Sequence, residues 1–346
     1  FAQFAGTQYA VALANGTVAL DVALKALGIG AGDDVIVTSR TFLASASSIV
    51  TAGANPIFAD VELDSQNISR RTIEAVITPN TKAIICVHLA GWMCDMDPIM
   101  QLARDKGLYV IEDCAQAHGA QYKGKLAGSI GHIAAWSFCQ DKIMTTGGEG
   151  GMVTTNDEEL WKKMWSYKDH GKNFDSIYNK QHPPGFRWLH DSFGTNWRMM
   201  EMQAVIGRIQ LTKMPEWTKK RKDHSDIILN AFENSPYFTV HRPSNDYVHA
   251  CYKCYVQVNI EKLPEGWSRD RIMQDINALG VPCFSGSCSE VYLEHAFDHT
   301  PWRPEKRLEN AKKLGETSLM FLVHPTLSEQ SMQKTIAAIH TVIAKI

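Results

Sequence analysis

The sequence has no long hydrophobic run and no excess of basic residues. Its 346 residues contain no apolar stretch of the roughly 18 residues that a membrane span needs, so we expect no membrane segment. Lysine and arginine together number 35 and acidic residues 37, which gives a net charge of −2. Because nucleic-acid-binding surfaces are basic, this balance argues against a nucleic-acid partner. Internal repeats and low-complexity linkers are missing too.

The eight cysteines give little support for a metal site. Most lie in apolar surroundings, as reduced and buried cysteines do, which favours a cytoplasmic protein. Cys251 and Cys254 have the spacing of a zinc pair, with Cys283 and Cys288 as the second pair. However, the pattern over 249–258 alternates like a strand, in which an odd spacing points two thiols to opposite faces. We therefore predict no metal.

The order of the expected elements predicts an α/β protein with two domains. Up to residue 237, strands alternate with helices, which is typical of a mostly parallel sheet with helices on both faces. The remaining strands and helices favour a smaller α+β unit. We predict a large domain over 1–237 and a small C-terminal domain over 238–346. Because Phe1 falls inside an expected helix, we also expect a natural segment to precede it.

The expected elements of the large domain follow from apolar periodicity. Strands are expected at 9–13, 34–38, 57–61, 83–88, 109–113, 133–138 and 151–155. Helices are expected at 18–27, 43–52, 72–77, 98–106, 157–168, 201–214 and 217–232. The polar, aromatic loop at 169–198 is long enough to be functional or to make subunit contacts. In the small domain we expect a strand at 252–260 and helices at 269–279, 305–318 and 329–346.

One lysine, Lys142, stands between a buried strand and a glycine-rich turn that begins at Gly147. A lysine placed in this way either clamps a phosphate or forms a Schiff base with a carbonyl. A P-loop has its glycines before the lysine and a serine or threonine directly after it. Here Ile143 follows the lysine and the glycines come later. The Schiff-base interpretation is therefore favoured over a P-loop and over an ordinary surface lysine.

Further ligand contacts are predicted at the same sheet edge. Gly16 and Thr17 begin a helix, where free N–H groups attract an anion, although Asn15 would serve equally well as a plain cap. Asp113 ends an apolar strand, where a carboxylate needs a cation or several donors. It is either a cap or the partner of a protonated ring nitrogen. Phe42 lies where ligands of open α/β sheets bind.

These features resemble the DegT/DnrJ/EryC1/StrS family of sugar aminotransferases, which are pyridoxal-phosphate enzymes of fold type I. That family places its serine five residues before its lysine and an acidic residue seven after it, as Ser137, Lys142 and Glu149 are placed here. The resemblance covers nearly the whole chain through motifs in matching order: Asn15-Gly16-Thr17, Thr41-Phe42, Glu112-Asp113, Gln116, Ser137, Lys142, Gly148-Glu149-Gly150-Gly151, Gly194, Asn196, Arg198 and Val323-His324-Pro325.

The resemblance implies roles around the cofactor ring. Lys142 would bond the cofactor and later move the proton to or from the sugar carbon. Asp113 would pair with the pyridine nitrogen, and only an ionised carboxylate keeps that nitrogen protonated near neutral pH. Phe42 would stack on the ring, and Gln116 would contact its hydroxyl. His118 is then expected to be a hydrogen-bonded structural histidine, because the lysine carries the proton.

The resemblance also implies a phosphate cup and a second subunit. Asn196 would reach the cofactor phosphate of the neighbouring subunit in a homodimer, and Arg198 beside it would meet substrate phosphate. The residues expected to form the cup within one subunit are Gly16, Thr17, Val18 and Ser137.

The implied activity is amination of a keto-sugar, nucleotide-linked, with glutamate as amino donor, in polysaccharide or secondary-metabolite sugar biosynthesis. The stretch 282–288 differs from the His-Tyr-x-Pro stretch with which many relatives touch the sugar nucleotide, so the sugar stays open. One alternative is a sugar dehydratase of the same fold, in which a histidine replaces the lysine; Lys142 argues against it. The other is a non-catalytic regulator that keeps the cofactor.

Overall fold

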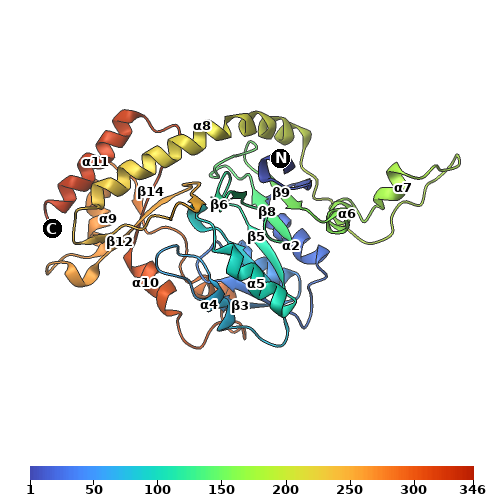
Figure 1. The fold of residues 1–346 in the computed structure, drawn as a ribbon, viewed down its shortest axis with the longest axis horizontal. Helices are drawn as coiled ribbons and strands as arrows, with labels where there is room; N and C mark the ends of the chain where they lie inside the picture. Colours follow the sequence, from blue (N-terminus) through green and yellow to red (C-terminus); the bar gives the residue numbers. More distant parts are fainter.

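The computed structural model describes residues 1–346, and its centre is a seven-stranded sheet in the order β1-β9-β8-β5-β4-β2-β3 (Figure 1). Neighbouring strands from β8 to β3 run parallel, whereas β9 pairs antiparallel with both β8 and β1. The strands are β1 (Tyr9–Leu13), β2 (Asp34–Thr38), β3 (Asn55–Ala59), β4 (Thr81–Val87), β5 (Tyr109–Asp113), β8 (Ile133–Ser137) and β9 (Gly151–Thr155).

Helices cover both faces of this sheet because its buried strands are apolar on both sides. Ile85 and Val87 of β4 pack into one hydrophobic cluster with α2, α3 and α6. Ile84 and Cys86 pack into the other cluster with α5. The predicted fold class is therefore confirmed. The helices of this part are α1 (Ala2–Ala5), α2 (Gly16–Ala26), α3 (Ala44–Thr51), α4 (Arg70–Glu74), α5 (Met96–Lys106) and α6 (Glu158–Tyr167).

A second, antiparallel sheet of four strands follows, in the order β10-β12-β14-β13. A third sheet of three short strands, β11-β6-β7, joins the segment at 247–248 to the first half of the chain. The division at 237/238 stays a prediction. The elements are β6 (Gln121–Tyr122), β7 (Lys125–Leu126), β10 (Phe238–Thr239), β11 (Tyr247–Val248), β12 (Cys254–Val258), β13 (Cys283–Phe284), β14 (Ser318–Phe321), α9 (Arg269–Ala278), α10 (Glu309–Thr317) and α11 (Glu329–Ile343).

The two helices expected at 201–214 and 217–232 are one continuous helix, α8 (Glu201–Phe232), so that expectation is wrong. Pro215 lies inside it and removes one backbone donor. Met214 and Arg221 are nevertheless buried on either side of the proline, so tertiary packing holds the helix together across it. Figure 1 shows α8 running from the seven-stranded sheet to the second sheet. No helix, α8 included, is both long and apolar enough to cross a membrane.

The second sheet also differs from the sequence expectations. The helix expected at 305–318 begins at Glu309, and Ser318 already belongs to β14, a strand that was not predicted. All four residues of β14 are buried, and a short apolar run of this kind has no periodicity that separates strand from helix.

Strand alternation predicts that the thiols of Cys251 and Cys254 point to opposite faces, but the structure does not show this arrangement. Strand β12 begins only at Cys254, and Cys251 before it has a left-handed φ of 49°. This turn breaks the alternation, and both cysteines join the same hydrophobic cluster.

The long segment at 169–198 contains a short helix, α7 (Phe174–Tyr178), and projects as an arm from the body (Figure 1). Two antiparallel bridges, Lys172 with His190 and Asp169 with Asn196, pair the limbs of the arm. Aromatic side chains near its end are exposed, among them Phe186 and Trp188.

A buried carboxylate ties β5 to the strands and loops around it. Glu112 accepts hydrogen bonds from the amides of Gly128, Ile130 and Gly131, and His88 Nε2 lies 2.9 Å from its Oε2. His88 Nδ1 accepts from the Cys94 amide, so Nε2 carries the proton and donates to Glu112. Cys114 lies beside this pair. Both carboxylate oxygens are thus satisfied within the chain, which makes Glu112 structural.

We expect Glu112→Gln to lower the free energy of unfolding by at least about 3 kcal/mol, because the substitution breaks a buried, fully hydrogen-bonded charge. Glu74→Gln is the control, because Glu74 forms an exposed pair with Arg70 and its loss should cost at most about 0.5 kcal/mol. Urea denaturation of both variants measures the difference.

The contribution of Glu112 to the free energy of unfolding should depend on pH. Burial alone would raise the pKa of Glu112, but the hydrogen bonds from His88 and from the Gly131 and Gly128 amides hold it below its usual value. A carboxyl with a lowered folded pKa stabilises the fold above its unfolded pKa, and that stability is lost as pH falls through the folded pKa. The gap between wild type and Glu112→Gln should therefore shrink in acid; a gap that is absent at neutral pH would contradict this account.

Candidate active site

Three predicted site residues lie at one edge of the seven-stranded sheet, where its parallel strands end. Asp113 is the last residue of β5, and Ser137 the last of β8, the strand beside it. Phe42, with Thr41 before it, lies four residues beyond the end of β2 at Thr38. Because parallel neighbours end on the same side, the chain gathers these residues from distant positions in the sequence.

Asp113 is buried, and its carboxylate has two donors in this chain. Ser45 Oγ lies 2.8 Å from Oδ2, and the Ala115 amide lies 3.1 Å from Oδ1. Thr41 Oγ1 lies 2.8 Å from Ser45 Oγ, which extends the network toward Phe42. Ser45 was not predicted from the sequence; its position four residues after Thr41, on the first turn of α3, is the available signal. The carboxylate has no cationic partner and keeps lone pairs for one.

Helix α2 begins unusually close to the end of β8. A Cβ added at Gly16 would lie 2.5 Å from Ser137 Cβ and 2.9 Å from Ser137 Oγ. A Cβ at Gly151 would lie 2.2 Å from the carbonyl oxygen of Asn15. The Asn15 side chain accepts from the Val18 amide at 3.0 Å, and the first N–H groups of a helix have no partner inside it. Two glycines therefore let a helix N-terminus and the Ser137 hydroxyl share one small space.

Lys142 stands in the loop between β8 and β9, with its neighbours Ile143 and Met144 buried. Its side chain is half-buried, and Nζ lies 5.3 Å from the centre of the Tyr252 ring. The Tyr252 hydroxyl donates to Asp141 Oδ2 at 2.6 Å. Although burial would raise the pKa of Asp141, the Tyr252 hydroxyl and the charge of Lys142 lower it. Lys142 thus lies against the Tyr252 ring, and Asp141, the residue before Lys142, holds that ring through its hydroxyl. The role of Tyr252 was not predicted from the sequence.

The remaining predicted ring contacts differ in exposure. Gln116 is buried, and its Oε1 accepts from the Ala90 amide at 2.7 Å, which leaves its NH₂ group free. Phe42 is 69% exposed. A flat apolar ring that remains open in this way offers a face for a ligand to stack on.

His118 is buried between the rings of Trp136 and Phe138, and neither of its nitrogens has a hydrogen-bond partner. The expectation of a hydrogen-bonded histidine is therefore wrong. Burial, and then the charges of Lys142 and Arg221, lower the pKa of His118 to about 3. The ring is neutral and packs as an aromatic side chain.

Asn196 and Arg198 lie beside the end of β1 rather than over the centre of the sheet edge. The Ala14 amide donates to the carbonyl of Trp197 at 2.9 Å, and Arg198 bridges to Leu13. Asn196 is exposed, and its side chain accepts from Arg198 Nε at 3.0 Å. Arg198 also lies 3.4 Å from Asp169. Both polar groups thus face outward, where another molecule can reach them.

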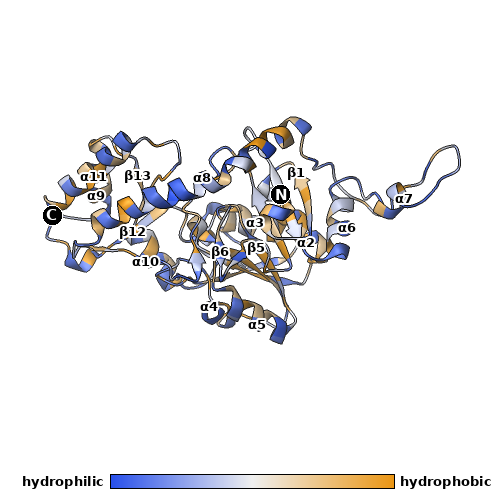
Figure 2. Ribbon diagram, turned by 45° about the horizontal axis from the view of Figure 1, so that its top comes forward, coloured by the Kyte–Doolittle hydropathy of each residue, from blue (hydrophilic) through white to orange (hydrophobic).

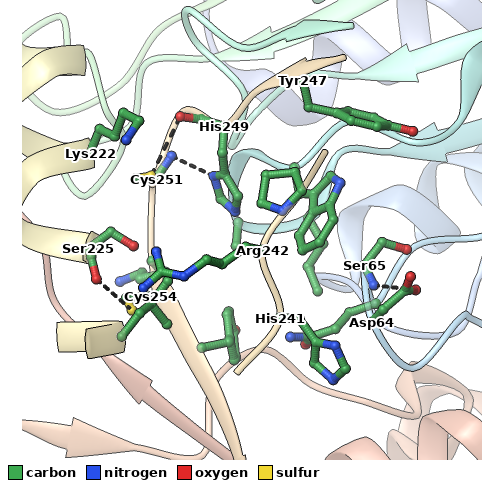
Figure 3. A pocket seen from close by; sticks show the side chains of 18 of the residues that line it. Asp64, Ser65, Lys222, Ser225, His241, Arg242, Tyr247, His249, Cys251 and Cys254 are labelled. Carbon is green, nitrogen blue, oxygen red and sulfur yellow. Dashed lines mark hydrogen bonds between the residues drawn. The ribbon is translucent and has the colours of Figure 1, made fainter. Parts of the chain in front are cut away.

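A cavity of about 400 Å³ lies apart from these residues (Figure 3). The loops at 64–66 and 89–92, the second half of α8 and the segment 241–257 form its wall. Trp92, Tyr247 and His249 are its aromatic residues near the third sheet. None of the predicted site residues lines it, whereas Lys253, the neighbour of Tyr252, does.

Comparisons with known proteins identify a family and several similar proteins. The model of the DegT/DnrJ/EryC1/StrS aminotransferase family matches residues 1–340. GDP-perosamine synthase of Caulobacter vibrioides is 37% identical over 348 residues, covering 99% of this chain and 88% of that protein. The solved structure of the aminotransferase from Psychrobacter cryohalolentis has a TM-score of 0.99 and 64% identity, and the match covers 100% of this chain and 90% of that one. A sugar aminotransferase of Streptococcus pneumoniae, 26% identical, has been solved in PLP and PMP forms.

The residues at the sheet edge fit pyridoxal 5′-phosphate. The space between Gly16 and Ser137 offers helix N–H groups and a hydroxyl, which suit a phosphate dianion. Asp113 offers a buried carboxylate without a cation, and Phe42 an open aromatic face. Lys142 supplies the amine. These four kinds of group match, in order, the phosphate, the basic ring nitrogen, the ring and the aldehyde of that cofactor.

We expect Gly16→Ala to weaken cofactor binding about tenfold or more, because its Cβ would force α2 and β8 apart, and overpacking of this kind costs about 1–3 kcal/mol. Gly30→Ala is the matched control, because a Cβ there meets nothing closer than 3.7 Å. Absorbance titration of the apoprotein with pyridoxal 5′-phosphate measures both. Equal affinities in the two variants would show that the close approach does not shape the phosphate site.

Proposed function

This chain belongs to the DegT/DnrJ/EryC1/StrS aminotransferase family, and on that premise we propose that it aminates a keto-sugar that is joined to a nucleotide, with glutamate as the amino donor. Sugar aminotransferase activity and dependence on pyridoxal 5′-phosphate are properties of the family and of its relatives. The observation that carries the proposal is that Asp113 and the Gly16–Ser137 cup lie at the ends of the neighbouring strands β5 and β8, and that the loop leaving β8 carries Lys142.

When bound, the cofactor supplies a carbonyl for the amine and a ring that withdraws electrons from the carbon that loses a proton. Asp113 serves this chemistry by holding a proton on the ring nitrogen. Its carboxylate is fixed by Ser45 and the Ala115 amide, so it does not have to reorient to accept that N–H. A charge-assisted hydrogen bond in such a buried place is worth roughly 1.5–3 kcal/mol.

Lys142 Nζ is the group that would move a proton from the donor carbon to the cofactor and, in the second half of the reaction, from the cofactor to the sugar carbon. The amine suits this role because it lies against the Tyr252 ring, which limits the directions in which its flexible chain can point. General acid–base catalysis by a positioned group of this kind contributes about 10²–10⁴-fold to a rate. This amine also distinguishes an aminotransferase from a dehydratase of the same fold.

The other predicted contacts position the cofactor rather than react. Phe42 covers one face of the ring, and the free NH₂ group of Gln116 donates to the ring hydroxyl. The phosphate is held by the start of α2 and the end of β8, through Gly16, Thr17, Val18 and Ser137, with Asn196 from the neighbouring subunit.

The sugar substrate carries a nucleotide in this proposal because the Caulobacter relative is named for a GDP-linked amino-sugar. Arg198 is the residue that we assign to its phosphate groups. Its guanidinium is about half exposed and lies next to Asn196, and guanidinium groups match phosphate oxygens in pairs.

A homodimer is part of the proposal, supported by one face of α8. Met202, Val205, Ile206 and Ile209 recur at helical spacing and are exposed. Figure 2 shows hydrophobic colouring in this first half of α8. An apolar stripe on a rigid helix suits burial against a second copy. We also place the enzyme in the cytoplasm, where its eight free cysteines remain reduced.

Borohydride treatment of the yellow holoenzyme should fix the cofactor covalently to Lys142, which peptide mass spectrometry detects. Lys142→Ala should hold the cofactor without this bond and lose amination by about 10²–10⁴-fold or more. Lys262→Ala, on the surface, is the control and should keep both label and activity. A label on a different lysine would sink the assignment.

Mixing two inactive variants tests the shared site. In a heterodimer of Lys142→Ala with Asn196→Ala, one site would carry both lesions and the other none, if Asn196 serves the neighbour's cofactor. Random exchange of subunits should then restore roughly a quarter of the wild-type activity. No recovery would mean that each Asn196 serves its own subunit.

A further inference from the structure

The surroundings of Lys142 contain more positive charge than one cofactor lysine explains. Lys253 Nζ lies 4.7 Å from the centre of the Tyr252 ring, the same ring on which Lys142 Nζ lies at 5.3 Å. Lys253 is half-buried and forms no ion pair within this chain. The nearby carboxylate, Asp141, already accepts from the Tyr252 hydroxyl. Two ammonium groups therefore share one aromatic ring and one nearby carboxylate.

A third cation, Arg221, adds to this imbalance. It is only 2% exposed, its Nε has no hydrogen-bond partner, and Nη1 makes a single long contact of 3.5 Å with the carbonyl of Cys251. A buried guanidinium normally has a carboxylate partner, because an unpaired buried charge is costly. Burial is the largest cause of the lowered pKa of Lys253; the charge of Asp141 acts against it and raises the pKa, whereas the charges of Lys142 and Arg221 lower it further. The charges of Lys142 and Arg221 therefore act on Lys253.

His324 contributes a donor on the same side. Its Nδ1 accepts from the Thr326 amide at 3.3 Å, so the neutral ring carries its hydrogen on Nε2. Burial lowers the pKa of His324, and the charges of Arg221 and Lys253 lower it further. The exposed Nε2–H, together with Lys253, presents donors without a matching acceptor.

We propose that Lys253, backed by Arg221 and flanked by His324, binds a carboxylate of the amino donor. This inference rests on the proposed function and names the subsite for its first substrate. A carboxylate is favoured over the diphosphate of the sugar substrate because of its distance from the reacting carbon. The carboxylate of an amino acid is bonded directly to the carbon whose nitrogen is transferred, so its partner must stand beside Lys142. The diphosphate of a nucleotide-linked sugar is several bonds away from a keto carbon of the ring.

Lys253 is a positioning residue in this account, because it holds the donor while Lys142 moves the proton. The charge, and not the shape, of its side chain should therefore matter. Lys253→Met removes the ammonium and keeps an unbranched chain, whereas Lys253→Arg keeps a cation. Lys262→Met removes an exposed lysine near the far end of β12 and is the matched control.

Calorimetric titration of the holoenzyme with glutarate, an unreactive dicarboxylate, tests the subsite without turnover. Titration with UDP tests the diphosphate alternative. We expect Lys253→Met to weaken glutarate binding by about tenfold or more, the usual effect of losing a charge-assisted hydrogen bond, and to leave UDP binding unchanged. Lys253→Arg should restore most of the glutarate affinity, and Lys262→Met should behave as the wild type.

Three results would overturn the proposal: an unchanged glutarate affinity, an equal loss for both ligands, or a loss for UDP alone. His324→Leu provides a second test if Lys253→Met does not fold, and should weaken glutarate about threefold by removing one neutral donor. Failure of the proposed function has a different signature. If glutarate binding depends on Lys253 but glutamate does not bleach the yellow holoenzyme, the subsite stands and glutamate is not the amino donor.

Discussion

The site depends on the close approach of helix α2 to the end of strand β8. Only glycine at position 16 permits this approach, since any Cβ there would overlap Ser137. Gly151 allows the same helix start to lie against β9. The approach brings unpaired N–H groups and a hydroxyl together one strand away from Asp113, and Lys142 follows Ser137 on the next loop. A phosphate held in this space fixes the distance at which a planar cofactor can reach both the carboxylate and the amine.

Two adjacent carboxylates on β5, those of Glu112 and Asp113, have different roles: the first stabilises the fold and the second is available to a ligand. Glu112 and Asp113 point to opposite faces, as successive strand residues do. Glu112 is satisfied by three amides and His88. Asp113 keeps only Ser45 and one amide, and so retains capacity for a ligand. A dense polar network beside the site thus holds β5 in place while the neighbouring carboxylate stays available for a proton on the cofactor.

The sequence predicted correctly those strands whose apolar runs coincide with the buried segments of the structure. Strands β1, β2, β5 and β9 begin and end where apolar runs do, and the edge at which Asp113 and Phe42 meet follows from parallel order. Three features were beyond local pattern. Helix α8 continues through Pro215 because of long-range packing, β14 is too short to show periodicity, and Cys251 lies before β12 in a left-handed conformation. The cations around Tyr252 were missed for the same reason, because only tertiary structure places Lys253 and Arg221 near Lys142.

A two-step single-turnover experiment tests the central claim, amination of a sugar by this site, most directly. Holoenzyme is first treated with glutamate, which converts its cofactor to the aminated form, and the remaining glutamate is then removed. A panel of nucleotide-linked keto-sugars is added next, while the cofactor absorbance and the sugar mass are followed. The account predicts that one of these sugars restores the yellow colour and gains an amino group in place of its keto oxygen, about one per cofactor. A sugar that loses water instead, or a cofactor that never leaves its first form, would contradict it.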